Sequence, residues 1–124
     1  MSLGLRSSCA ERIQLPLSVI LLSGSTNGLP IPVAATATPG TSIHTVTSSV
    51  NGSDEVYLWV SNVTGSAATL TVEWGGVTDP GSLITKALSI PANSGPTLLA
   101  NGISLAGGLV IRAFSGTASA LNIT

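Results

Sequence analysis

Turn-forming residues interrupt this sequence so often that no long helix fits between them. Such residues recur along the 124 residues, at Asn27-Gly28, Pro39-Gly40, Asn51-Gly52, Thr64-Gly65, Gly75-Gly76, Asp79-Pro80-Gly81, Asn101-Gly102, Gly107-Gly108 and Gly116. Each supplies a residue that tolerates positive φ, or a proline that fixes φ in a turn. The runs between them are rich in β-branched Val, Ile and Thr and show no helical period. The sequence therefore predicts an all-β domain.

The runs between these turns define the expected strands. We predict a single antiparallel β-sandwich or jelly-roll-like domain over residues 15–124, preceded by an extended N-terminal arm over residues 1–14. The arm has no strand alternation, and we expect it to become ordered on a partner. The expected strands cover residues 15–22, 30–37, 42–48, 55–62, 67–74, 83–90, 97–99, 109–114 and 118–123.

The clearest alternation lies in DEVYLWVSNVTGSAATLTVEWGG, residues 54–76. Two period-two arms flank a short Thr-Gly-Ser turn, which predicts a central hairpin with one buried face. The set expected in the core is Val56, Leu58, Val60, Leu70, Val72 and Trp74. The set expected on the outer face is Tyr57, Trp59, Thr69, Thr71 and Glu73. The outer aromatics either contact a protein partner or lie beneath a second layer of the same domain.

The composition leaves little charge for a soluble surface. Charged residues make up 7% of the chain and its mean hydropathy is +0.54, whereas an average domain is about 25% charged. The longest apolar run, residues 15–24, is too short for the roughly 20 residues of a membrane span. We therefore predict no membrane insertion and a surface that is partly covered by other subunits, as in a homo-oligomer.

The same apolar run also has features of a signal-peptide core, because Arg6 and Arg12 precede it and small residues follow. Glu11, Pro16 and the absence of an A-x-A site argue against that interpretation. We favour an arm that leads into a first strand.

Few residues offer chemistry. The cations Arg6, Arg12, Lys86 and Arg112 form no cluster, so the sequence predicts no nucleic-acid partner. Cys9 and His44 are too few to hold a structural metal, and we expect no metal or other cofactor.

The spacing of the polar residues does not indicate a catalytic site. His44 alternates with Ile43, so we expect it to face solvent or an interface, and no G-x-S-x-G nucleophile motif accompanies it. Glu55 and Glu73 could approach each other across the expected hairpin, but a carboxylate beside a turn usually serves solubility. The prediction is a protein that is not an enzyme.

Residues 29–124 resemble small β-sandwich virion structural proteins of tailed bacteriophages. The resemblance lies in an IPV-type first strand, in DEVYLWVSNVTGSAATLTVEWGG and in ITKALSIPANSGPTLLANGISLAGGLVIRAF. It implies a capsid decoration (cement) protein, commonly a trimer, that is made in the cytoplasm of the host bacterium. Its expected place is the capsid exterior of the virion, on the major capsid protein.

Two other functions remain open at this stage. One is a head–tail connector or tail structural protein of a phage, since these share the sandwich. The other is a secreted carbohydrate-binding or adhesion module that uses Tyr57 and Trp59. The residues expected at a partner interface are Arg6, Arg12, Tyr57, Trp59 and Arg112.

Overall fold

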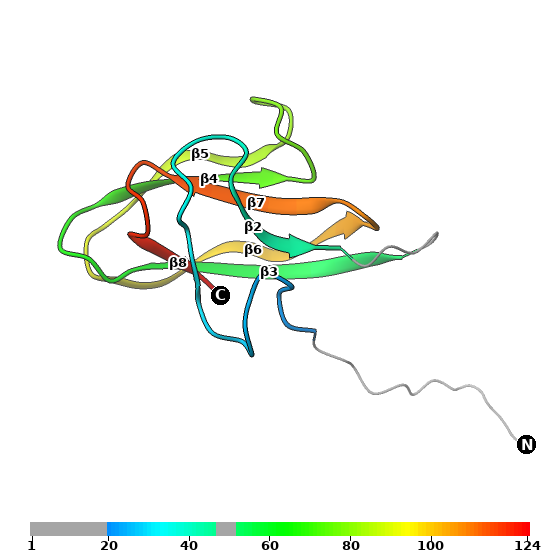
Figure 1. The fold of residues 1–124 in the computed structure, drawn as a ribbon, viewed down its shortest axis with the longest axis horizontal. Helices are drawn as coiled ribbons and strands as arrows, with labels where there is room; N and C mark the ends of the chain where they lie inside the picture. Colours follow the sequence, from blue (N-terminus) through cyan, green and yellow to red (C-terminus); the bar gives the residue numbers. More distant parts are fainter. Residues whose placement is uncertain (1–19, 47–51) are drawn as a thin grey trace, which may run out of the picture.

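Two antiparallel β-sheets face each other in the computed structural model, which describes residues 20–46 and 52–124 (Figure 1). No helix occurs in these two ranges. The strands are β1 (Ile31–Pro32), β2 (Thr41–Thr45), β3 (Ser53–Asn62), β4 (Ala68–Trp74), β5 (Leu83–Ile90), β6 (Ser94–Ala106), β7 (Val110–Ser115) and β8 (Leu121–Ile123). The predicted all-β sandwich is confirmed, whereas the predicted arm, residues 1–14, lies outside the described residues.

The strands pair in a nested order. β4 pairs with β5, β3 with β6, β2 with β7 and β1 with β8, and every pair is antiparallel. The chain is thus one long hairpin, and it is rolled up so that β3 also meets β8 and β4 also meets β7. The resulting sheet orders, β1-β8-β3-β6 and β2-β7-β4-β5, are those of an eight-stranded jelly roll.

Aliphatic side chains from both sheets fill the space between them. The largest fully buried apolar side chains are Ile43, Leu58, Leu70, Ile90, Ile111, Leu121 and Ile123. Burial of one such side chain contributes about 1.5–3 kcal/mol. The predicted core positions of β3 and β4 are confirmed, with Trp74 packed half-buried against the same core.

The predicted hairpin of residues 55–62 and 67–74 is wrong. β3 and β4 lie in opposite sheets, and their aliphatic faces meet across the core instead of side by side in one sheet. Alternation identifies the buried face of a strand but does not identify its neighbour. The connection is therefore an arch that crosses from one sheet to the other.

Asn62 holds this arch together. Its side chain is fully buried; Nδ2 donates to the carbonyl oxygens of Ser66 (2.9 Å) and Ile90 (3.2 Å). Its Oδ1 accepts from the backbone N–H (2.9 Å) and the hydroxyl (2.6 Å) of Thr64. One amide thus replaces the ladder bonds that a tight hairpin turn would have supplied.

We expect Asn62→Ala to lower the free energy of unfolding by about 2 kcal/mol, because it leaves a buried carbonyl of Ile90 and a turn amide without partners. Urea denaturation measures the change. Asn122→Ala on neighbouring β8, where the side chain is only half-buried, is the matched control and should cost much less. Equal losses in the two variants would contradict the role given to Asn62.

The predicted short strand 97–99, followed by a turn at Asn101-Gly102, is also wrong. Residues 97–99 belong to β6, a strand of 13 residues that continues through Asn101 and Gly102. Val56 pairs with Ile103 and Tyr57 with Asn101, which leaves Gly102 as an extra residue at φ 76°. Positive φ at glycine serves a β-bulge as well as a turn. The Asn101-Gly102 pair therefore correctly predicted a residue with positive φ, but this residue forms a β-bulge within β6 and not a turn between two strands.

The second and last predicted strands are shorter in the structure than expected. Residues 30–37 and 118–123 are strand only at Ile31–Pro32 and Leu121–Ile123. Just beyond β1, Val33 keeps two backbone bonds, from its N–H to Leu121 O (2.9 Å) and from Ser119 N–H to its carbonyl (2.8 Å). Residues 20–22 are not strand, and residues 15–19 are not described.

Candidate interaction site

His44 is buried, contrary to the expectation that it faces solvent or an interface. Only 6% of the residue is exposed, and its Nε2 lies 2.7 Å from Oδ2 of Asp54 at the start of β3. The register of β2 shifts between Ser42 and His44, so a β-bulge turns both Ile43 and His44 inward. A bulge of this kind breaks the strict alternation on which the prediction rested.

Both ring nitrogens of His44 are engaged. Nδ1 accepts the backbone N–H of Ser23 at 3.0 Å, and since that amide can only donate, the neutral ring carries its proton on Nε2 and donates it to Asp54. The pair links Ser23 to β2 and β3. Two further bonds fasten the same segment, from Thr45 N–H to Ser23 Oγ (2.6 Å) and from Gly24 N–H to Ile43 O (2.9 Å).

Ser23, His44 and Asp54 therefore bring together the three residue types of a serine hydrolase without its geometry. A nucleophile must share a hydrogen bond with the base that takes its proton. Here the second ring nitrogen binds the backbone amide of Ser23, and the Ser23 hydroxyl accepts from Thr45 instead. The arrangement is suited to holding the segment in place.

The two carboxylates considered as a pair do not meet. Glu55 lies on β3 and Glu73 on β4, in opposite sheets. Glu73 was expected on an exposed outer face, but it is 1% exposed. Its Oε2 accepts from the Thr38 hydroxyl (2.6 Å) and its Oε1 from the Gly40 N–H (2.7 Å), because the segment that leads into β2 covers this part of β4.

Tyr57 and Trp59 lie on the outer face of β3, as predicted, with 46% and 38% of each residue exposed. Trp59 pairs with Leu98 on β6, which is 47% exposed, so the three side chains share one face of the sheet. We call Tyr57, Trp59 and Leu98 the aromatic face. Its exposure on an ordered strand makes it the strongest candidate for a contact surface.

A groove of about 610 Å³ adjoins the aromatic face. Ile20, Leu21 and Leu22 line it together with His44, the stretch of β3 from Ser53 to Tyr57, and Trp59. The groove thus combines apolar side chains with the carboxylates of Asp54 and Glu55.

The other predicted interface residues do not join this surface. Arg112 lies on β7 in the opposite sheet, where it pairs in register with Ser42 and Glu73. Arg6 and Arg12 lie outside the described residues. Among the described residues, Tyr57 and Trp59 thus lie together on one surface beside Leu98, and Arg112 lies on the other sheet.

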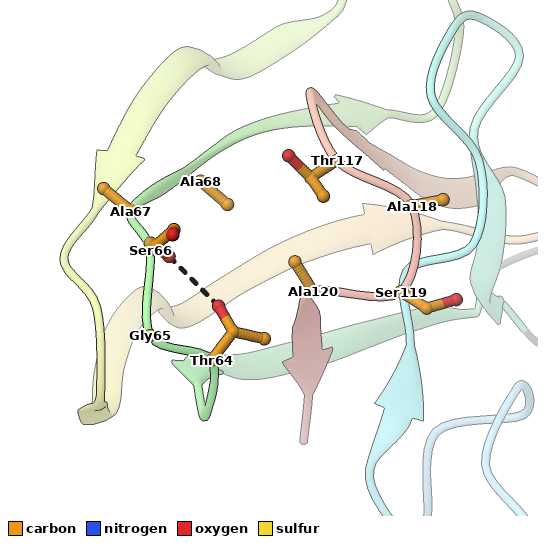
Figure 2. Close-up of a pocket in the computed structure, with 9 residues that line it drawn as sticks. All are labelled: Thr64, Gly65, Ser66, Ala67, Ala68, Thr117, Ala118, Ser119 and Ala120. Atoms are coloured by element: carbon orange, nitrogen blue, oxygen red, sulfur yellow. Dashed lines mark hydrogen bonds between the residues drawn. The ribbon is translucent and has the colours of Figure 1, made fainter.

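A second hollow, of about 260 Å³, lies between the β3–β4 arch and the residues that precede β8 (Figure 2). Threonine, serine, alanine and glycine line it, and Thr64 Oγ1 lies 3.0 Å from the carbonyl oxygen of Ser66 at its border. The lining offers no charged or aromatic side chain. It has nothing with which to orient a ligand beyond hydroxyl and backbone groups.

Comparison with known families and proteins does not assign the chain to a family. No family model, no curated protein and no solved structure matches the chain. Among residues 20–46 and 52–124, no group of three His, Cys, Asp or Glu side chains could hold a metal ion. The same residues include no helix of the length and hydropathy needed to cross a membrane.

Proposed function

We propose that this protein is a structural virion protein of a tailed bacteriophage. It acts as a capsid decoration protein that binds the major capsid protein at the capsid exterior and stabilises the lattice. One observation carries the proposal: a rigid jelly roll with very few charges exposes the aromatic face of Tyr57, Trp59 and Leu98. Large aromatic side chains on an ordered surface are typical anchors of protein–protein contacts.

The fold supports this proposal by analogy. Eight-stranded jelly rolls occur in viral capsid proteins, as they do in lectins and cupins, and the architecture is thus one that a virion protein can have. The engaged ring nitrogens of His44 argue against a role for this residue as a general base. A connector or tail position would use the same kind of surface.

Decoration would stabilise the shell by mass action, since a protein that binds only the assembled lattice favours assembly. A homo-oligomer would present several aromatic faces at once and so turn modest single-site affinity into firm attachment. The low charge of the surface favours such self-association. We infer a trimer, the form that the resemblance to capsid decoration proteins implies.

Light scattering on the isolated protein checks the oligomer. The expected mass is about three times the 12.3 kDa of one chain, and it should hold across a broad range of concentrations. A mass of one chain throughout that range would remove the oligomer from the proposal.

Co-sedimentation with empty shells of the major capsid protein of the same phage tests the function itself. We expect saturable binding to assembled shells and none to unassembled capsid subunits. Binding to neither form would contradict the decoration role.

The groove supports a second candidate, a carbohydrate-binding or adhesion module. Aromatic rings beside carboxylates, as in Tyr57, Trp59, Asp54 and Glu55, are groups that can bind sugars by stacking and hydrogen bonding. Glycan-array binding by the isolated protein that is lost in Tyr57→Ala, together with no binding to shells, would favour this candidate over decoration.

A further inference from the structure

β3 has a partner along only part of one side. It is 10 residues long, whereas β8 has three residues and pairs with β3 only at Val60–Asn62. The last contact is a pair of backbone bonds between Trp59 and Thr124 (2.8 and 2.9 Å). Beyond it, residues 53–58 pair with β6 alone among the described strands, and Figure 1 shows β3 extending well past the C mark. We call residues 53–58 the open half of β3.

Within residues 20–46 and 52–124, the open half has no backbone partner on the side away from β6. In an antiparallel ladder, residues two apart direct their N–H and C=O groups to the same side. Since Trp59 bonds toward β8, Tyr57 and Glu55 direct theirs toward the open side. Such a row of donors and acceptors is a template for one more strand.

The groove described above lies along this open half. Ile20 and Leu21, with 68% and 55% of each residue exposed, line the groove with it and form its apolar wall. A site with an apolar wall and unpaired backbone groups suits an extended apolar peptide. The carboxylates of Asp54 and Glu55 at the groove disfavour an acidic one.

The outer edges of the two sheets are better protected. β1 contains Pro32; β5 carries Lys86 and, at Ala87, a φ of 49°. β6 contains Pro96 and the bulge at Gly102. The edge of β2 is partly occupied by the bond from Gly24 N–H to Ile43 O. Prolines, charged side chains and bulges are the usual means by which edges avoid extra strands. The open half of β3 has no proline or lysine, its two carboxylates lie near its start, and the extra residue at its register shift belongs to β6.

We propose that residues 15–19, LPLSV, of a second copy of this chain occupy the groove and pair with the open half of β3. The segment is apolar and uncharged, and it immediately precedes Ile20, which forms the groove wall in every copy. Pro16 is tolerated because the added strand would have a free outer edge there. Donation from each copy to the next gives a ring when the rotation between copies closes, so the inference rests on the proposed oligomer.

A second copy is favoured over the same chain by geometry. Ile20, Leu21 and Leu22 already line the groove beside residues 53–57, so a strand of the same chain paired with those residues would need a tight turn just before Ile20. Residues 14–22, QLPLSVILL, contain none of the Gly, Asn or Asp residues that favour two-residue hairpin turns. A neighbouring copy can supply the segment without a turn.

Amide hydrogen exchange of the full chain, without any capsid, tests the proposal. In the wild type we expect slow exchange at the amides of Glu55 and Tyr57. Leu17→Asp should speed exchange at these two amides by at least about tenfold, because an acidic arm no longer fits the groove. The matched control, Leu3→Asp, makes the same substitution outside the proposed strand and should leave them slow. Fast exchange at both amides in the wild type, or equal rates in the two variants, would overturn the proposal.

A mixing experiment identifies which copy supplies the strand. Isotope-labelled Leu17→Asp protein is combined with an excess of unlabelled wild type, and only the labelled chain is observed. Restored protection of its Glu55 and Tyr57 amides means that another copy supplies the strand. Protection that is present in the wild type but not restored by mixing would assign the strand to the same chain and overturn the proposal. Because no capsid is involved, either failure is distinguishable from a failure of the shell-binding test.

Discussion

Leu58→Asp is expected to unfold the domain. Leu58 is fully buried at the centre of β3, among the aliphatic side chains that both sheets contribute to the core. An aspartate there would place a carboxylate without a partner in an apolar interior, at a cost of several kcal/mol. That cost is comparable to the 5–15 kcal/mol that stabilises a typical domain. Circular dichroism and urea denaturation measure the loss.

Tyr57→Asp is the matched control, because the same aspartate is introduced one residue away on the exposed face. This variant should keep the β-sheet spectrum and lose about 1 kcal/mol or less. If both variants unfolded alike, the assignment of the two faces of β3 would be wrong.

Trp59→Ala should behave oppositely to Leu58→Asp, folding normally but binding shells poorly. Truncation of an aromatic anchor typically costs about 2 kcal/mol of binding, which corresponds to a roughly 30-fold weaker Kd. Leu88→Ala removes a side chain of similar exposure from β5 in the opposite sheet and serves as the control. Weakening of both variants to the same degree would place the interface elsewhere.

Glu73→Ala is the second large effect, with an expected loss of about 3–4 kcal/mol in the free energy of unfolding. The buried carboxylate accepts one bond from the Thr38 hydroxyl and one from the Gly40 amide. Hydrogen bonds to charged groups contribute about 1.5–3 kcal/mol each, and both donors would lose their acceptor. Glu73→Gln keeps one oxygen acceptor and should lose less.

Glu55→Ala is the control for Glu73→Ala, since it removes an exposed carboxylate from β3. Its expected cost is within about 0.5 kcal/mol. Hydrogen exchange at the Gly40 amide adds a local readout, because this amide should exchange faster in Glu73→Ala. Unchanged stability together with slow exchange at Gly40 would contradict the role given to Glu73.

The sequence predicted which residues are buried better than it predicted which strands are neighbours. Alternation placed Leu58 in the core and Trp59 on the outer face, because period two follows directly from strand geometry. The pairing of β3 with β6 depends on residues about 40 positions apart, and no local pattern encodes it. The side chain of Asn62 makes the β3–β4 connection an arch, and its four bonds form only in the folded chain.

The buried polar groups were missed for a related reason. A bulge in β2 turns His44 inward toward Asp54, and the Thr38–Gly40 segment covers Glu73. Neither event leaves a periodic signal in the sequence. The turn pairs Asn27-Gly28 and Pro39-Gly40 indicate that the chain folds back before β2. They do not indicate that the folded-back segment covers β4. The aromatic face, by contrast, was accessible to sequence reasoning because it depends on alternation within one strand.

The capsid-binding proposal is tested most directly by imaging phage particles with and without this protein, at a resolution that resolves individual strands. We expect extra density on the outside of the capsid lattice, present only in particles that contain the protein. The jelly roll should fit this density with Tyr57, Trp59 and Leu98 at the contact with the major capsid protein. Identical capsid surfaces in the two preparations would contradict the decoration role, and density confined to the neck or tail would assign the protein there instead.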